Sequence, residues 1–310
     1  MNDVLKGADC RIDQGDCIEI MAGMPSACVD MLVTSIPFPS LYAYTGDEAD
    51  IGNSEDLSGE APVHLSFFYK QVRRVVKPGR AVLIHVMDIP RLKRSGGEGL
   101  YDFGGLNARL GERAGLVFAY GWAVRKNPQA QAIRTKSREL QFAGLESDRA
   151  RSRGALPDRL LKFVVPGDNA VPVVSKGEVS RNDWIEWAEH CWADIRETDT
   201  LNVREARDEE DTKHICPLQL GLIERCIRLF SNPGEVVFDP FMGIGSVAFV
   251  ALGGRSPATG NGLARQRRAM GCELKPTYHR QAVKNAEKAR RQFAESQRTL
   301  FDNVEGSSCR

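Results

Sequence analysis

The sequence lacks any apolar run of 18 residues, the length at which a segment becomes a candidate membrane span. Its first ten residues, MNDVLKGADC, also lack the apolar core of a secretory signal. The eight cysteines form no C-x-x-C pair, and no histidine stands at zinc-finger spacing from them. These absences exclude a membrane span and lead us to expect a cytoplasmic protein with reduced thiols and no metal site.

The chain also lacks an excess of one charge, with 42 Lys and Arg residues against 41 Asp and Glu residues. Its 42% hydrophobic and 27% charged residues are ordinary for a folded protein and exclude a disordered chain. The near-neutral total hides a basic segment at 125–162, where ten Lys and Arg residues stand against four acidic residues. This segment predicts contacts with nucleic-acid phosphates, or alternatively a solvated charged helix.

Apolar runs and turn signals predict alternating strands and helices. We expect strands at 28–38, 81–87, 116–124, 160–165, 236–238 and 271–274, and helices at 64–76, 217–230, 247–252 and 278–297. This alternation is typical of α/β proteins, and 310 residues suit one large α/β domain with an insertion.

The strand at 236–238 runs into a glycine-containing loop, Asp239-Pro-Phe-Met-Gly243-Ile-Gly245, which leads directly into a helix. Glycines in such a loop let the backbone turn tightly and approach a nucleotide-like ligand at the sheet edge. A dinucleotide-binding fold is the first competitor, but its fingerprint needs a third glycine where Ala248 stands. Glu273, at the end of the next strand, is placed to bond ribose hydroxyls.

A second loop, Thr34-Ser35-Ile36-Pro37-Phe38, forms the C-terminal end of the segment 28–38, where the predicted strand runs into a loop. The Ser35 hydroxyl and a backbone carbonyl can accept both N–H bonds of a planar amine. The Phe38 ring can stack on the heterocycle that carries this amine. We therefore expect this loop to bind an exocyclic amino group.

Together these motifs resemble the amino-group DNA methyltransferases of the β arrangement, over about residues 10–95 and 205–290. The matching pieces, in chain order, are Gly15-Asp16, Ser35-Ile36-Pro37-Phe38, Lys213-His214 with Pro217, the Asp239 to Gly245 loop, and Gly271-Cys-Glu273 with Tyr278. The resemblance implies a Rossmann-like class I methyltransferase fold. Its sheet would be mixed and mostly parallel, and circularly permuted, because the catalytic motif precedes the cofactor loop.

The resemblance also implies roles for individual residues. The catalytic set would be Ser35, Ile36, Pro37 and Phe38. S-adenosylmethionine would lie against Asp16, Cys17, Lys213, His214, Pro217, Asp239, Pro240, Phe241, Gly243, Gly245, Ser246 and Glu273. The basic segment occupies the place of the family's target-recognition region, with DNA contacts expected from Arg125, Lys126, Arg134, Lys136, Arg138, Arg151 and Arg153.

The implied reaction is direct methyl transfer from S-adenosylmethionine to the exocyclic amine of a base flipped out of double-stranded DNA. Serine at the first motif position favours cytosine N4, and adenine N6 is the alternative. A non-catalytic DNA-binding relative and a nucleotide-binding oxidoreductase are the competing classes. The sequence leaves open whether the protein forms a homodimer, and no restriction endonuclease partner is evident. We expect an enzyme of phage or prophage type that acts in a bacterial cytoplasm.

We expect a catalytic half at 1–124, an inserted recognition region at 125–205, a cofactor half at 206–298 and a disordered tail at 299–310.

The sequence departs from the family in two places. Ile36 replaces the first proline of the catalytic motif, so the loop needs support from elsewhere, for which Pro39 and Phe38 are candidates. The segment 253–268, GGRSPATGNGLARQRR, is longer than usual and is interpreted as a flexible surface loop, with a phosphate contact as an alternative.

Overall fold

The computed structural model describes residues 3–39, 50–53, 59–91, 99–135, 138–140, 142–175, 177–202 and 217–307. Three predicted site residues, Lys136, Lys213 and His214, lie outside these ranges. Within them, no helix is both long and apolar enough to cross a bilayer.

One eight-stranded sheet with the order β1-β10-β9-β2-β3-β7-β6-β8 organises the molecule. The first five strands in this order are mutually parallel, and β7 is antiparallel to both of its neighbours. The strands are β1 (Cys10–Gln14), β2 (Met31–Ser35), β3 (Ala81–Val86), β6 (Val117–Val124), β7 (Asp158–Val164), β8 (Cys191–Trp192), β9 (Val236–Asp239) and β10 (Arg268–Glu273). The prediction of a mixed, mostly parallel sheet is confirmed, and its circular permutation stays a prediction.

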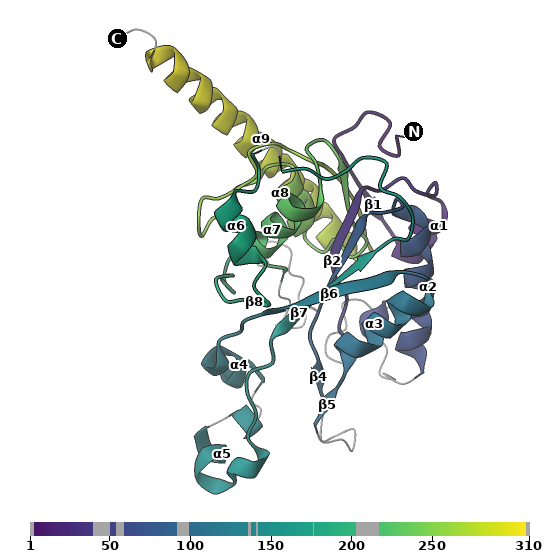
Figure 1. Cartoon of the computed structure of the whole chain (residues 1–310), viewed down its shortest axis with the longest axis vertical. Helices are drawn as coiled ribbons and strands as arrows, with labels where there is room; N and C mark the ends of the chain where they lie inside the picture. Colours follow the sequence, from purple (N-terminus) through teal and green to yellow (C-terminus); the bar gives the residue numbers. More distant parts are fainter. Residues whose placement is uncertain are drawn as a thin grey trace.

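Helices cover both faces of this sheet (Figure 1). On one face lie α1 (Cys17–Ala22), α2 (Glu60–Val75) and α3 (Phe103–Arg113); on the other lie α6 (Arg181–Trp187), α7 (Leu220–Phe230), α8 (Ser246–Ala251) and α9 (Pro276–Ser307). Because both faces are buried, β2 reads as a continuous apolar run. The buried apolar side chains form two clusters. The Met31 and Val33 side chains belong to one cluster, and the Leu32 side chain belongs to the other.

The predicted insertion is divided between the sheet and a projecting lobe. β7 and β8 come from residues 125–205 but are strands of the main sheet. Between β6 and β7, the helices α4 (Pro128–Thr135) and α5 (Phe142–Ser147) extend away from the body beside the small hairpin of β4 (Ile89–Pro90) and β5 (Leu100–Tyr101) (Figure 1). We call the described residues between 128 and 157 the lobe.

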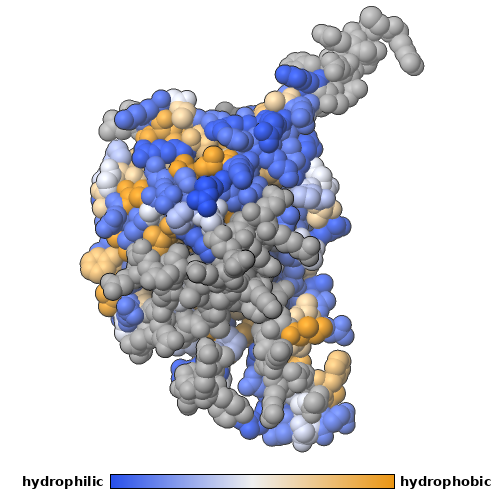
Figure 2. Space-filling model, turned by 180° about the vertical axis from the view of Figure 1, so that it is seen from behind, coloured by the Kyte–Doolittle hydropathy of each residue, from blue (hydrophilic) through white to orange (hydrophobic). Residues whose placement is uncertain are grey.

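Hydrogen bonds join the two ends of the lobe to each other. The Gln131 side chain donates to the Leu156 carbonyl at 2.9 Å and accepts from the Leu156 N–H at 2.8 Å. Hydrophobic and hydrophilic surface lie side by side on the lobe (Figure 2), where the most exposed apolar side chains are Ile133 and Phe142. At the C-terminal end, α9 continues past the predicted end at 297 and reaches Ser307, within the segment expected to be a disordered tail.

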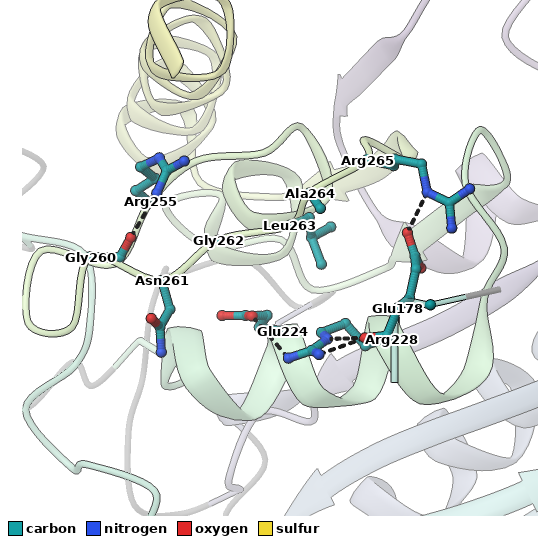
Figure 3. Close-up of a pocket in the computed structure, with 11 residues that line it drawn as sticks. Glu178, Glu224, Arg228, Arg255, Gly260, Asn261, Gly262, Leu263, Ala264 and Arg265 are labelled. Atoms are coloured by element: carbon teal, nitrogen blue, oxygen red, sulfur yellow. Dashed lines mark hydrogen bonds and ion pairs between the residues drawn. The ribbon is translucent and has the colours of Figure 1, made fainter. Parts of the chain in front are cut away.

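The segment 253–268 lies at the surface as expected, with residues 257–261 exposed, and buried polar contacts of Ser256 and Arg267 hold it to the body on either side of this stretch. The Ser256 hydroxyl donates to Asp199 at 2.5 Å. Arg267 is 1% exposed, and its guanidinium donates to both carboxylate oxygens of Glu178 and to the Ser231 carbonyl. Figure 3 shows the cavity of about 450 Å³ beside this segment, where Arg265 also reaches Glu178.

Replacing Arg267 with Met should lower the free energy of unfolding by about 3–5 kcal/mol, because the substitution leaves part of the Glu178 charge buried without its partner. The Arg265→Met variant is the matched control: this arginine contacts the same carboxylate from an exposed position, and its loss should change stability by about 1 kcal/mol or less. Urea unfolding of both variants measures the difference. Equal losses of unfolding free energy in the two variants would show that the buried Arg267–Glu178 ion pair stabilises the protein no more than the exposed Arg265–Glu178 ion pair.

Candidate active site at the carboxyl edge of the sheet

Five neighbouring parallel strands, β1, β10, β9, β2 and β3, end at the same edge of the sheet. Their registers place Gln14 beside Glu273, and Ser35 beside His85. Polar residues that follow or end these strands therefore form a row at this edge, where ligands of open α/β sheets bind.

The glycine loop after β9 adopts the conformation that its sequence predicts. Gly243 and Gly245 have φ angles of 55° and 88°, in the left-handed region that side chains disfavour. A Cβ on Gly245 would lie 2.9 Å from the Ala282 backbone, whereas the Cβ position of Gly243 faces open space. The loop is supported from α9, since the Asn285 amide donates to the Ile244 carbonyl at 2.8 Å.

Glu273 connects this loop to the end of β10. Its Oε2 accepts from the Gly243 N–H at 2.8 Å, and its Oε1 accepts from the Lys275 N–H at 2.9 Å. Burial raises the pKa of Glu273 to about 7. A carboxylate with lone pairs still available beside an open glycine backbone fits the predicted binding of ribose hydroxyls.

Two of the residues predicted to bind S-adenosylmethionine, Asp16 and Cys17, lie just beyond the end of β1. Asp16 caps α1, its Oδ1 accepting from the Ile18 N–H at 2.8 Å. The Cys17 side chain is buried in the core beneath α1, and burial raises the pKa of its thiol. Pro217, just ahead of α7, is half-buried.

Asp239 links the glycine loop to β2. Its Oδ1 accepts from the Thr34 hydroxyl at 2.5 Å and from the Phe241 N–H at 3.0 Å. Burial raises the pKa of Asp239 to about 7, although both hydrogen bonds oppose this shift. Pro240 and Ser246 are both buried, and the Phe241 ring packs against the Phe68 ring.

The predicted catalytic tetrapeptide follows β2 and is supported by β3. Ile36 is 1% exposed, and its N–H donates to the His85 carbonyl at 3.2 Å. A proline at this position could not donate that hydrogen bond, so isoleucine supplies by burial and pairing the support that proline supplies by its locked φ. Pro37 and Phe38 are half-buried, Pro39 is buried, and the Phe38 ring lies 6.1 Å from Phe103.

Sequence reasoning missed two polar residues beside Ser35. His85 Nδ1 lies 2.9 Å from the Ser35 hydroxyl, and His85 Nε2 lies 2.9 Å from Asp158. Burial would raise the pKa of Asp158, but its contacts with His85 and Lys126 lower it overall. The sequence feature that could have indicated His85 as a site residue is that it is the one polar residue in the apolar strand AVLIHVM, near its carboxyl end.

The predicted DNA-contacting residues are found in different environments. Arg125 and Arg151 are exposed, and Arg134 and Arg138 belong to α4 and to the turn after it. Arg153 pairs with Glu139 at 3.3 Å. The Lys126 side chain is only 10% exposed and lies 2.6 Å from Asp158, which directs it toward the sheet edge.

The Asp239→Asn substitution should remove a pH-dependent cost of burial. Between the ordinary pKa of 3.8 and about 7, the unfolded chain ionises this carboxyl while the folded protein keeps its proton. Wild-type stability therefore falls as pH rises through this window, and the neutral amide avoids the loss. Relative to wild type, the variant should gain about 2–4 kcal/mol of unfolding free energy between about pH 4 and pH 8.

Urea unfolding across this pH range measures the difference. The Asp168→Asn variant, which changes an exposed carboxyl, is the control and should follow the wild type at every pH. An Asp239→Asn difference that does not change with pH would show that Asp239 is ionised throughout.

Solved structures with the same fold include DNA methyltransferases. The DNA modification methylase TTHA0409 of Thermus thermophilus aligns with a TM-score of 0.64 and 21% identity, covering 90% of this chain and 95% of that one. The PvuII DNA methyltransferase, which is cytosine-N4-specific, aligns with a TM-score of 0.63 and 16% identity, covering 93% and 92%. At these identities the likeness concerns the fold.

Sequence comparison adds the family. The type II methyltransferase M.BglI of Bacillus subtilis is 28% identical over 131 residues, which is 42% of this chain and 30% of that protein. This chain therefore matches less than a third of that relative's length. Residues 29–284 match the N6/N4 methyltransferase family, described as DNA methylase, and this range includes the catalytic tetrapeptide, the glycine loop and Glu273. The chain belongs to this DNA methylase family.

Proposed function

We propose that this protein transfers a methyl group from S-adenosylmethionine to the exocyclic amine of a base in double-stranded DNA. One observation carries the proposal: the parallel pairing of β2 with β9 brings the Ser35 tetrapeptide beside the glycine loop. The buried Thr34–Asp239 hydrogen bond fastens the two segments together. A site that binds an amine thus adjoins a site suited to a nucleoside.

The residues present fit S-adenosylmethionine. Glu273 and Asp16 offer carboxylate oxygens at neighbouring strand ends, and Gly243 leaves its surroundings open. TTHA0409, which shares the fold, was solved in complex with S-adenosyl-L-methionine. When bound, this compound supplies a sulfonium methyl group; the amine lone pair forms the N–C bond, the S–C bond breaks, and one proton is released.

The tetrapeptide makes the amine a better nucleophile. Its lone pair is delocalised into the ring, so it must turn out of conjugation before it can attack. Accepting hydrogen bonds from the amine, the Ser35 hydroxyl and the Ile36 carbonyl would hold it in that orientation. Phe38 would stack on the base, which must leave the duplex to reach this edge. Lys213 and His214 remain proposed contacts of the methionine part.

Cytosine N4 is the favoured acceptor, and adenine N6 is the alternative. Serine at position 35 favours cytosine, and the similar fold of the cytosine-N4-specific PvuII enzyme supports this choice. A non-catalytic DNA-binding relative is the second candidate, because Ile36 departs from the motif. The buried, hydrogen-bonded Ile36 backbone weighs against it, since the loop keeps its support.

DNA would lie along the site edge and the lobe, where Arg125, Arg151 and the backbone positions of Arg134 and Arg138 cluster in sequence. Lys136 and Arg153 complete the proposed phosphate contacts, whereas Lys126 is engaged by Asp158. Figure 1 shows the lobe and the β4–β5 hairpin projecting from the same end of the molecule. A homodimer and a phage origin stay predictions, and the sequence leaves open whether a restriction enzyme accompanies the protein.

Incubation of duplex DNA with the protein and S-adenosylmethionine should yield N4-methylcytosine, detected by mass spectrometry of the released nucleosides. The Ser35→Ala variant should lower the transfer rate by about 10²-fold, the scale for losing one preorganised hydrogen-bonding group at a reaction centre. Its affinity for S-adenosylmethionine, measured by calorimetry, should not change.

The exposed Ser26→Ala substitution is the matched control and should keep the wild-type rate. Methylation of adenine would select the alternative base. Binding of cofactor and DNA without any methylated nucleoside would select the non-catalytic relative, and binding of NAD in place of S-adenosylmethionine would refute the proposal.

Removing the Arg125 and Arg151 charges together, as Arg125→Gln/Arg151→Gln, should weaken DNA binding and its salt dependence. The slope of log K against log salt should become less steep by about 0.9 for each phosphate that the protein no longer neutralises. Fluorescence anisotropy at several salt concentrations measures it. Arg291→Gln, an exposed change on α9 away from the lobe, is the control, and an equal effect there would contradict the assignment.

A further inference from the structure

His85 touches three of the four residues of the catalytic tetrapeptide. Its Nδ1 lies 2.9 Å from the Ser35 hydroxyl, and its backbone carbonyl accepts from the Ile36 N–H at 3.2 Å. Its ring meets the Phe38 ring edge to face at 6.5 Å. The residue is 6% exposed and lies on β3 directly beside Ser35 in the strand register. A side chain in this position controls how the serine hydroxyl is oriented.

A buried charge pair lies behind the imidazole. His85 Nε2 is 2.9 Å from Asp158 Oδ2, an ion-pair contact outside the angular range of a hydrogen bond. The same oxygen lies 2.6 Å from Lys126 Nζ. Asp158 begins β7 and Lys126 follows β6, so neighbouring strands bring both residues to the edge that carries Ser35.

We propose that His85 is a positioning residue, which Asp158 holds in the tautomer with its proton on Nε2, so that Ser35 donates to Nδ1 and can only accept from the substrate amine. The proposal rests on the proposed function and deepens it. A carboxylate beside Nε2 favours a proton on that nitrogen, which leaves Nδ1 as an acceptor. The Ser35 hydroxyl then donates its hydrogen to His85 Nδ1, and the lone pairs of the Ser35 oxygen face the substrate.

The opposite tautomer would reverse the hydrogen bond. With its proton on Nδ1, the imidazole would donate to Ser35, and the serine hydrogen would turn toward the amine. Two hydrogen-bond donors would then face each other, and the amine would lose the acceptor that turns its lone pair out of conjugation. A carboxylate that fixes a tautomer in this way is known to matter by orders of magnitude in serine hydrolases.

The chain of contacts also explains Lys126. A charged lysine that is 10% exposed needs a partner, and Asp158 provides it at the same oxygen that faces His85. The ammonium lies 2.6 Å from the carboxylate and favours its ionised form beside the imidazole. Lys126 thus acts on the catalytic loop from within the protein, and its neighbour Arg125 is the one exposed to solvent.

Four variants separate a tautomer role from a packing role. His85→Asn keeps an acceptor near the Nδ1 position but has no tautomers, whereas His85→Phe keeps ring volume without an acceptor. Asp158→Leu/Lys126→Met removes the charge pair as a whole, which leaves no single buried charge. The fourth variant combines this pair with His85→Asn.

The transfer rate kcat should fall by about 10²-fold in His85→Phe and by less than about tenfold in His85→Asn. Asp158→Leu/Lys126→Met should lower kcat by about tenfold when His85 is present and should add nothing when Asn stands at 85. The KM for S-adenosylmethionine should stay at its wild-type value throughout. The exposed His190→Asn change is the matched control and should leave kcat unaltered.

A direct measurement needs no activity. Nitrogen-15 chemical shifts of the His85 ring in the whole protein should show a proton on Nε2 and none on Nδ1, with the signals assigned through His85→Asn. A proton on Nδ1 would overturn the inference. So would additive losses in the combined variant, an inactive His85→Asn, or a fully active His85→Phe. If the wild-type protein transfers no methyl group, the proposed function fails while the chemical shifts still decide the tautomer.

Discussion

The parallel pairing of β2 with β9 is the contact on which the site depends. It joins Met31 to Val237 and Leu32 to Phe238, across about two-thirds of the chain. The Thr34–Asp239 hydrogen bond, between residues 205 positions apart, completes this pairing in a buried environment. Because parallel strands point their carboxyl ends to one edge, this pairing brings the Ser35 tetrapeptide and the glycine loop together.

Buried acids set the electrostatic character of this edge. Asp239 and Glu273 both have a pKa raised to about 7 by burial, and each also accepts backbone hydrogen bonds from the glycine loop or its flanks. Like charges so close are costly in a dry site, so the protein spaces them along separate strands and supplies N–H donors to each.

The basic side of the molecule is organised differently. The excess of Lys and Arg at 125–162 suggests one electrostatic surface, but the fold divides it between the lobe, the sheet and buried pairs. Lys126 forms an ion pair with Asp158, and Arg153 forms one with Glu139. Charge along a sequence therefore predicts a partner more reliably than it predicts which side chains reach that partner.

Local elements of this protein could be predicted from its sequence alone, because apolar periodicity and Gly-Pro punctuation act over a few residues. Strands β2, β3, β6, β7, β9 and β10, the glycine loop and the tetrapeptide were visible in this way, whereas β1 and β8 were not, and the family match covers both loops. Three features emerged only in the folded chain: β7 enters the sheet, Ile36 replaces proline by pairing with β3, and His85 and Asp158 meet beside Ser35. These outcomes depend on strand order and register, in which residues distant along the chain become neighbours, and no local pattern encodes that order.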